Sequence, residues 1–294
     1  MNIDIVNRIK RIAIIALASD DELVETLVLK GGNAIDLAYR PSSEKISRTS
    51  FDLDYSLVNG DFDEDEETIS NRIKKTLEQT FLENEYVVID YKFLHRPKRM
   101  REDLADFWGG YKVEFKVVER KLYDNHKGNI TQVRNSSISV NPSTSTVFEV
   151  EFSKFEYVGE KRPVDVDGYT IYVYTPEMIV FEKLRAICQQ LSNYKEVIPS
   201  FTPRARARDF YDIHLIMEMR EIDLALPDNL ELIKNIFQAK KVPVGYIKNI
   251  RNNKTLHLDN WQDVKDTISP HETIQDFDYY FNFVLVNFEN LTFL

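Results

Sequence analysis

Two acidic residues separated by one position, Asp52 and Asp54, have the types and the spacing of metal ligands. Polar and apolar residues alternate over residues 50–55, which predicts a strand whose two carboxylates project from one face while its apolar residues face the core. Two carboxylates held about 7 Å apart repel each other unless a divalent cation lies between them. The pattern therefore predicts a cation site. A solvated strand edge is the other interpretation of such a segment in an acidic protein.

A pair of glycines, Gly31 and Gly32, follows the apolar residues 27–29 and precedes residues 33–38, which have the apolar spacing of a helix. This order predicts a strand, a tight turn and a helix. Glycines let backbone N–H groups approach a ligand closely, and the N-terminus of a helix favours anions such as phosphate. Combined with the acid pair, the turn predicts chemistry on a nucleoside triphosphate, whereas the glycines alone also fit an ordinary turn.

A third carboxylate on a neighbouring strand would complete a two-metal site, because it could bind one ion and help to deprotonate an attacking hydroxyl. Residues 147–153 alternate strictly and place Glu149 and Glu151 on one face, which makes Glu151 a candidate. Glu114, in the predicted strand 110–119, is the alternative.

A lysine and an aspartate in the C-terminal half extend the candidate site. Lys183 lies beside the apolar stripe of a helix predicted to begin after Thr175, so its ammonium group could reach into a cleft while its stem is buried. Asp209 and Asp212 are three residues apart and share one face of the next helix. Without further context Lys183 could equally be an ordinary surface lysine, and Arg208, Asp209 and Asp212 could form a structural ion-pair network that docks two helices.

The residues Lys-Gly-Gly-Asn-Ala at 30–34, followed by Arg48 and Ser50 ahead of the acid pair, resemble the signature of the AbiEii/AbiGii toxin family. This family is a branch of the nucleotidyltransferase superfamily that includes polymerase β. The Lys183 helix and the residues Arg-Asp-Phe-Tyr-Asp at 208–212 resemble the family's second block. In that block the lysine and the aspartate of Arg-Asp are functional, which would let Lys183 neutralise phosphate oxygens and Asp209 orient the lysine or contact the nucleotide. Residues 150–153, Val-Glu-Phe-Ser, resemble the family's third-acid strand, which makes Glu151 the first choice for the third acid. The last 70 residues show no further motif of this resemblance.

The resemblance implies an α+β fold. Residues 1–174 would form a nucleotidyltransferase lobe, a mixed sheet flanked by helices, and residues 175–294 a mostly helical lobe. It also implies roles for the residues that match. Nucleotide would be bound by Gly31, Gly32, Arg48, Ser50 and Lys183; two Mg²⁺ ions by Asp52, Asp54 and Glu151; and Lys183 and Asp209 would complete the catalytic set.

The resemblance further implies a toxin of a bacterial toxin–antitoxin or phage-defence (abortive infection) system. Its substrate would be a nucleoside triphosphate, from which a nucleoside monophosphate passes to an acceptor hydroxyl. RNA, particularly tRNA, is the acceptor that the family suggests, and a cognate antitoxin is the expected partner. A degenerate protein that only binds nucleotide or antitoxin, and a kinase-like enzyme that transfers a terminal phosphoryl group, are the alternatives.

Composition limits the classes of partner and the cellular compartments that fit the chain. With 38 basic and 48 acidic residues the net charge is −10, which argues against bulk attraction to a nucleic-acid backbone, although local basic patches such as residues 95–101 remain. The single cysteine, Cys188, rules out an internal disulfide framework. The apolar part of the N-terminus is too short to span a bilayer and reads as an amphipathic helix. We therefore expect a cytoplasmic protein without a membrane contact.

Apolar periodicity predicts the other elements, apart from the polar residues 121–146, which predict a long hairpin or a partly mobile insertion. The separation between Gly32 and Asp52 is longer than in the shortest superfamily motifs. The extra residues 40–47 could shape the choice of base or acceptor, or could simply be an insertion. Helices are expected over 3–26, as one helix or as two with Ser19 and Asp20 as the candidate N-cap of the second, over 67–84, over 176–188 with Thr175 as N-cap, from 204, from 227 and over 277–288. Strands are expected over 86–94, 110–119, 147–153, 162–166 and 169–174, the last two joined by a hairpin turn at Asp167-Gly168.

Overall fold

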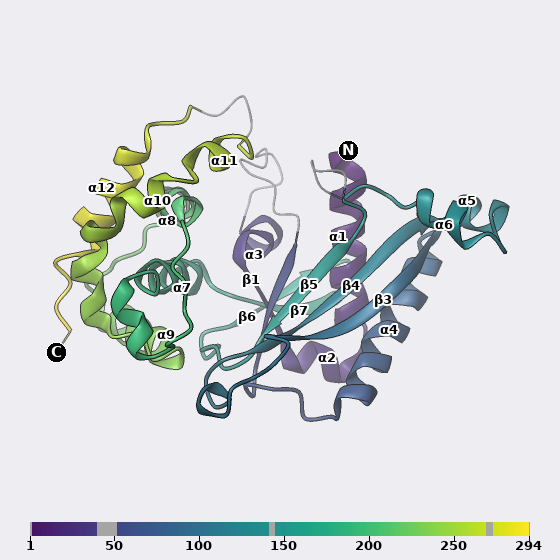
Figure 1. Cartoon of the computed structure of the whole chain (residues 1–294), viewed down its shortest axis with the longest axis horizontal. Coiled ribbons are helices and arrows are strands. Elements are labelled where there is room, and N and C mark those ends of the chain that lie inside the picture. The colour runs from purple at the N-terminus through teal and green to yellow at the C-terminus, as the bar shows by residue number, and fades with distance from the viewer. Residues whose placement is uncertain (1, 40–51, 141–144, 269–272, 294) are drawn as a thin grey trace. The chain divides into compact units, whose positions relative to one another are not determined.

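The computed structural model of the chain describes residues 2–39, 52–140, 145–268 and 273–293 (Figure 1). These residues form two compact units. The first comprises the described part of Met1–Ala34 and Ser50–Val173, and the second the described part of Ile35–Thr49 and Tyr174–Leu294. The helix α3 (Gly31–Ala38) therefore begins in the first unit and ends in the second. The predicted division into lobes of residues 1–174 and 175–294 remains a prediction about independently folding domains.

The first unit is built on a mixed sheet of seven strands within the described residues, in the order β3-β4-β5-β2-β1-β7-β6. β1 pairs in parallel with β7 and β2 in parallel with β5, and the other neighbours are antiparallel. The strands are β1 (Leu27–Lys30), β2 (Leu53–Leu57), β3 (Tyr86–Arg96), β4 (Gly110–Glu119), β5 (Phe148–Ser153), β6 (Arg162–Val166) and β7 (Tyr169–Val173). A mixed sheet with flanking helices confirms the expected α+β fold class.

Two long helices, α1 (Ile3–Ala18) and α4 (Glu66–Glu83), cover one face of this sheet (Figure 1). Alternate strand residues point toward them, and Phe115 on β4 contacts Phe81 on α4 with ring centroids 5.6 Å apart. Burying these apolar residues supplies the main driving force for the lobe. Because side chains alternate along a strand, the same packing turns the charged residues of β1, β2, β4 and β5 to the opposite face, called the polar face below.

Side-chain caps fix where these helices begin. Asn2 accepts hydrogen bonds from the first backbone N–H groups of α1, and Asp65 does the same for α4. Asp20 caps α2 (Asp21–Thr26), so the predicted helical region 3–26 is two helices with the break at the expected residues. The predicted Asp-Gly hairpin is also confirmed: Asp167 (φ 54°) and Gly168 (φ 85°) form the turn between β6 and β7.

Of the two interpretations of residues 121–146, the long hairpin was wrong in the described part, which holds two short helices, α5 (Arg120–Asn125) and α6 (Ile130–Asn135), and the partly mobile insertion stays a prediction. Asn129 caps α6 by accepting a hydrogen bond from the backbone N–H of Gln132 at 3.2 Å. Val133 is buried, and Arg134 forms an ion pair with Asp90 on β3 at 2.7 Å. The Asn129 cap, the buried Val133 and the ion pair of Arg134 thus stabilise helical structure in a segment whose polar composition alone favoured a hairpin or an insertion.

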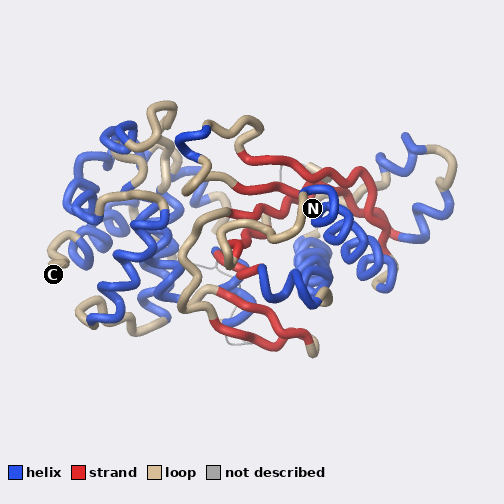
Figure 2. The backbone as a smooth tube through the Cα atoms, turned by 90° about the horizontal axis from the view of Figure 1, so that it is seen from below, coloured by secondary structure: helices blue, strands red, loops and turns tan. Residues whose placement is uncertain are grey.

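The second unit is helical in its described part, as Figure 2 shows by its blue segments. Thr175 caps α7 with a hydrogen bond from the N–H of Met178 at 3.3 Å, and Pro176 occupies the first helical position, as predicted. Aromatic residues of the last helix pack inside this unit. Its helices are α7 (Pro176–Cys188), α8 (Ala207–Met219), α9 (Pro227–Ala239), α10 (Lys254–Leu258), α11 (Trp261–Lys265) and α12 (Phe277–Phe288), with 3₁₀ segments η2 (Ser192–Glu196) and η3 (Val244–Asn253).

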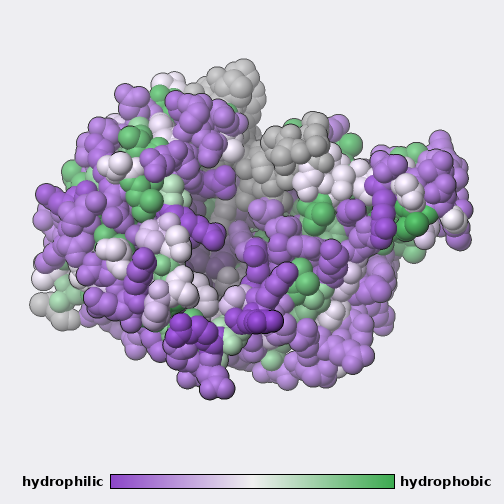
Figure 3. All heavy atoms as spheres, viewed as in Figure 1, coloured by the Kyte–Doolittle hydropathy of each residue, from purple (hydrophilic) through white to green (hydrophobic). Residues whose placement is uncertain are grey.

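The surface is largely hydrophilic on the face drawn in Figure 3, where apolar residues form small patches among polar ones. Within the described residues, no helix has the length and apolar character needed to cross a bilayer. Cys188 is buried, and this burial raises the pKa of its thiol.

Replacing Phe115 with alanine should lower the free energy of unfolding by about 3–5 kcal/mol, because the fully buried ring leaves a cavity between α4 and the sheet. Ile130→Ala is the matched control: the side chain is 56 % exposed, so its loss should change stability by less than about 0.5 kcal/mol. Urea unfolding followed by circular dichroism measures both. Equal effects would show that the sheet is not packed on α4 as described.

Candidate active site

Strand pairing brings two of the predicted acids together. β2 and β5 run parallel with Asp54 opposite Glu151, so both carboxylates stand side by side on the polar face. On the other side of β2, Lys30 is paired with Asp54 in the antiparallel register with β1. Asp52 lies one residue ahead of β2 and is exposed. The sheet thus places Asp54 and Glu151 at neighbouring positions of its polar face, and Asp52 directly precedes β2.

The glycine turn lies directly against this pair of acids. Gly31 has a φ of +68°, a backbone conformation that residues with side chains rarely adopt. A Cβ built on Gly31 would lie 3.4 Å from Oδ2 of Asp54. Gly31 is also the first residue of α3, and Gly32 the second, so the predicted strand, turn and helix are confirmed. Backbone at Gly31 can therefore approach a ligand held by Asp54.

A buried asparagine holds the turn and the acid segment together. The side chain of Asn33 donates a hydrogen bond from Nδ2 to the backbone carbonyl of Asp52 at 2.6 Å. Its Oδ1 accepts one from Nζ of Lys10 on α1 at 3.2 Å, and both side chains are nearly buried. Sequence reasoning had given Asn33 no role and missed Lys10. The signal was present, since Lys10 is a charge inside the buried stripe of an amphipathic helix.

Arg96, at the end of β3, forms an ion pair with Glu151. One guanidinium nitrogen of Arg96 donates to Oε1 of Glu151 at 2.8 Å, and this hydrogen bond raises the pKa of the arginine. Arg96 belongs to the basic segment 95–101, whose exposed-loop and ligand-binding interpretations were both open. Its guanidinium here neutralises an acid of the candidate site.

The alternative third acid, Glu114, lies elsewhere on the polar face. It is on β4, paired with Glu149, and not on a strand next to β2. Lys112 donates to it at 2.8 Å and Lys92 lies at 3.8 Å. The hydrogen bond from Lys112 lowers the pKa of the Glu114 carboxyl, against the opposing effect of burial. Glu114 is thus held in ion pairs one strand further from Asp54 than Glu151 is.

The donor set fits a hard divalent cation, since carboxylate oxygens of Asp54 and Glu151 face the same side at paired positions. Across the described ranges, however, no three His, Cys, Asp or Glu side chains already lie close enough together to hold an ion. In this arrangement Arg96 binds Oε1 of Glu151.

Lys183 and the two aspartates of α8 form a buried cluster in the second unit. Nζ of Lys183 donates to Asp209 at 3.1 Å and to Asp212 at 2.7 Å, and these carboxylates are only 8 % exposed. Arg206 lies 3.3 Å from Asp209. Burial alone would raise the pKa of Asp209, but the charges of Lys183 and Arg206 outweigh it and lower the pKa. The predicted shared face of Asp209 and Asp212 is therefore confirmed, and the cluster joins α7 to α8.

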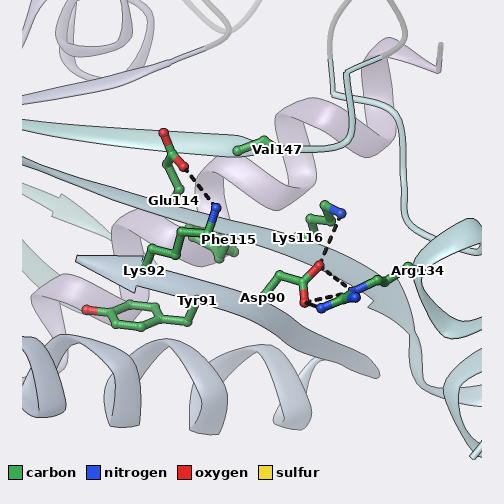
Figure 4. Close-up of a pocket in the computed structure, with 8 residues that line it drawn as sticks. All are labelled: Asp90, Tyr91, Lys92, Glu114, Phe115, Lys116, Arg134 and Val147. Carbon is green, nitrogen blue, oxygen red and sulfur yellow. Dashed lines mark hydrogen bonds and ion pairs between the residues drawn. The ribbon is translucent and has the colours of Figure 1, made fainter. Parts of the chain in front are cut away.

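A separate pocket of about 430 Å³ lies at another part of the first unit (Figure 4). Its polar side chains bind one another: Arg134 and Lys116 both point at Asp90, and Lys92 pairs with Glu114. Its lining contains none of the predicted site residues except the alternative acid Glu114.

Of the predicted nucleotide-binding residues, Arg48 and Ser50 lie outside the described residues, as do residues 40–47.

A mixed sheet with flanking helices, with a strand-glycine-helix turn beside the paired acids, is the fold that the sequence led us to expect of a nucleotidyltransferase. The family described as "Nucleotidyl transferase AbiEii toxin, Type IV TA system" matches residues 14–283 of the chain. The chain belongs to this family of nucleotidyltransferase toxins from type IV toxin–antitoxin systems, as its sequence signature implied.

Two solved structures were also found to be similar to the chain. MenT4, a nucleotidyltransferase toxin from Mycobacterium tuberculosis H37Rv, is 12 % identical and superimposes with a TM-score of 0.54 over 98 % of this chain and 84 % of its own. JHP933 from Helicobacter pylori is 16 % identical, with a TM-score of 0.47 over 95 % of this chain and 87 % of its own. At these identities the likeness concerns the fold. A search of curated proteins gave no match.

The buried histidine next to the Lys183 cluster should make stability depend on pH. His257 is completely buried, and this burial lowers its pKa from 6.5 to about 4. The unfolded chain therefore binds a proton between these two pH values while the folded chain does not, so this stabilisation is complete above pH 6.5 and is lost as pH falls toward 4. With about 1.4 kcal/mol per pKa unit, the loss from this group is about 3 kcal/mol.

Denaturant unfolding of wild type and His257→Leu at pH values from 7 to 4 measures this contribution. Other carboxyl groups titrate in the same window, so the difference between the two proteins is the informative quantity. The gap in unfolding free energy should shrink by about 3 kcal/mol on acidification. A constant gap would show that His257 is not a buried neutral histidine.

Proposed function

We propose that this nucleotidyltransferase moves a nucleoside monophosphate from a nucleoside triphosphate to a hydroxyl of its acceptor, with Mg²⁺ as the metal. The acceptor oxygen forms a bond to the α-phosphorus while the bond from that phosphorus to the bridging β-phosphate oxygen breaks. Pyrophosphate leaves, and the hydroxyl proton passes to a carboxylate and then to solvent. The observation that carries the proposal is the pairing of Asp54 with Glu151 beside Gly31.

Asp52, Asp54 and Glu151 are the residues that would hold two Mg²⁺ ions. When bound, the ions would neutralise phosphate charge and lower the pKa of a coordinated hydroxyl. Gly31 and Gly32 would offer backbone N–H groups to the triphosphate, with Arg48 and Ser50 as further nucleotide contacts. Release of Glu151 from Arg96 frees a carboxylate as proton acceptor, and the guanidinium so released is available to phosphate oxygens.

Lys183 and Asp209 are the residues of the helical unit that we assign to the reaction. The ammonium group of Lys183 would stabilise negative charge on the phosphates as pyrophosphate leaves, and Asp209 would hold that ammonium group in position. The pair is preorganised, since Lys183 contacts two buried carboxylates. A preorganised charge needs no rearrangement at the moment of reaction.

RNA, particularly tRNA, is the acceptor that we propose, with a cognate antitoxin as the protein partner and phage defence as the context. Such an acceptor and its nucleotide would place the activity in the cytoplasm. The net charge of −10 means that RNA binding must depend on local cations, such as those of residues 95–101, since the whole protein does not attract a polyanion.

A binding protein without catalytic activity is the second candidate function. The bond between Arg96 and Glu151 favours it, because this bond neutralises the third acid in the absence of ligand. Product formation distinguishes the two candidates, whereas stabilisation by nucleotide and metal would not. A terminal phosphoryl transfer of the kinase type would add a different mass to the acceptor, which mass spectrometry resolves.

Asp54→Asn, alone or with Asp52→Asn, should reduce nucleotide transfer at least about 100-fold, because it removes the ligands that neutralise the phosphates. Incubating the protein with each α-labelled triphosphate, Mg²⁺ and total bacterial RNA measures the activity, and excess EDTA should abolish it. Asp124→Asn, an exposed acid on α5, is the control and should transfer at the wild-type rate. Undiminished transfer by a folded Asp54→Asn variant would refute the site.

Glu151→Gln should lower transfer at least about 100-fold, and Glu114→Gln less than about 3-fold, since only Glu151 is paired with Asp54. Glutamine keeps the shape of glutamate, so thermal unfolding should show both variants to be folded. The reverse order of effects would assign the third acid to Glu114. An equally small effect of both would mean that two aspartates suffice.

A further inference from the structure

The first turn of α8 is capped by side chains from the C-terminal region. The residue at its N-cap position, Arg206, makes no side-chain capping hydrogen bond. The first backbone N–H groups of a helix need partners from outside it. The N–H of Arg206 donates to Nδ1 of His257 at 3.1 Å, and the N–H of Ala207 donates to Oδ1 of Asn260 at 3.2 Å. Two residues that no sequence pattern had singled out thus complete this helix end.

Packing fixes the ring that provides the first cap. His257 is fully buried, and its ring centroid lies 5.1 Å from that of Phe210 on α8. Phe210 in turn contacts Phe277 and Phe281 of α12, each at 5.4 Å. Because Nδ1 accepts a hydrogen bond, the ring must be neutral with its proton on Nε2.

The capped turn also carries the charge cluster. The backbone N–H of Asp209 donates to the carbonyl of Arg206 at 2.9 Å, so both residues belong to one turn. The carboxylate of Asp209 accepts from Lys183 at 3.1 Å and from Arg206 at 3.3 Å. A shift of this turn would therefore move the carboxylate that holds the lysine.

We propose that His257 and Asn260 are positioning residues, which hold the first turn of α8 through its backbone and so keep Asp209 against Lys183. The inference rests on the proposed roles of Lys183 and Asp209 in transfer. It gives the C-terminal residues, from α10 to α12, a function in the reaction. They hold the helix end that presents Asp209 to Lys183, and they act on the lysine through that helix end.

Pairs of variants separate the hydrogen bonds from simple packing. His257→Asn and Asn260→Asp retain an acceptor oxygen, whereas His257→Leu and Asn260→Leu remove it. Asn260 is only partly buried and its side chain does not cap α11, so Asn260→Leu remains informative if His257→Leu does not fold. His214→Leu is the control, because this histidine lies on α8 itself and packs on α12, with the ring centroid of Phe283 at 4.7 Å, but makes no described hydrogen bond to the first turn.

The leucine variants should lower kcat for nucleotide transfer about 10-fold and leave KM for the triphosphate within about 2-fold. The variants that keep an acceptor, and His214→Leu, should stay within about 3-fold of wild type. Equal losses in His257→Leu and His214→Leu would overturn the inference, because they would indicate general destabilisation.

A double-mutant cycle with Asp209→Asn tests the route through the aspartate. Asp209→Asn alone should cost more than either leucine variant, and adding Asn260→Leu to it should cost less than about 2-fold more. Losses that multiply independently would overturn the inference. A fully active Asp209→Asn variant would instead refute the proposed role of Asp209, on which the inference rests.

A measurement without turnover keeps the inference separate from the choice of acceptor. Lys183 and Arg206 lower the pKa of Asp209, so ¹³C titration of its carboxyl reports their contact. Asn260→Leu and His257→Leu should raise this pKa, and His214→Leu should leave it unchanged. An unchanged pKa in the folded leucine variants would overturn the inference even if no acceptor is found. A raised pKa in a protein that transfers no nucleotide would mean that only the proposed function has failed.

Discussion

Hydrogen bonding between the parallel strands β2 and β5 is the interaction on which the candidate site depends. It fixes the register that sets Asp54 beside Glu151, and the apolar residues between them pack on the helix-covered face. A slip of β2 by one residue would turn Asp54 into the core and expose the apolar side chains of that strand, so the register that buries the apolar residues also places the acid.

The charged side chains of the helical unit are positioned by other contacts than those of the sheet. Lys183 lies between two buried carboxylates, and burying charges is unfavourable unless they are paired and hydrogen-bonded. Asp209 also forms an ion pair with Arg206, and the backbone N–H of Arg206 donates a hydrogen bond to His257. Charge in each unit is therefore placed by backbone hydrogen bonds, made in one case by a neighbouring strand and in the other by side chains at a helix end.

Most elements could be predicted from the sequence because alternation and helical spacing are local. The strand, turn and helix around Gly31, the cap at Thr175 and the shared face of Asp209 and Asp212 all depend on neighbouring residues. Contacts between distant segments could not be predicted this way, as the bond between Asn33 and Lys10 shows. The two short helices within residues 120–135 could not be predicted for another reason. Such helices depend on single caps and ion pairs, which polar composition does not indicate.

The two parallel strand pairs also determine when the polar face can assemble during synthesis. Parallel neighbours cannot be joined by a tight turn, so β2 waits for β5 and β1 waits for β7, both much later in the chain. Such long-range pairing forms slowly compared with local helices. A polypeptide released before Phe148 would carry both aspartates but no strand to align them. Interrupted translation of this toxin therefore leaves fragments in which the acidic residues are present and the surface that arranges them is missing.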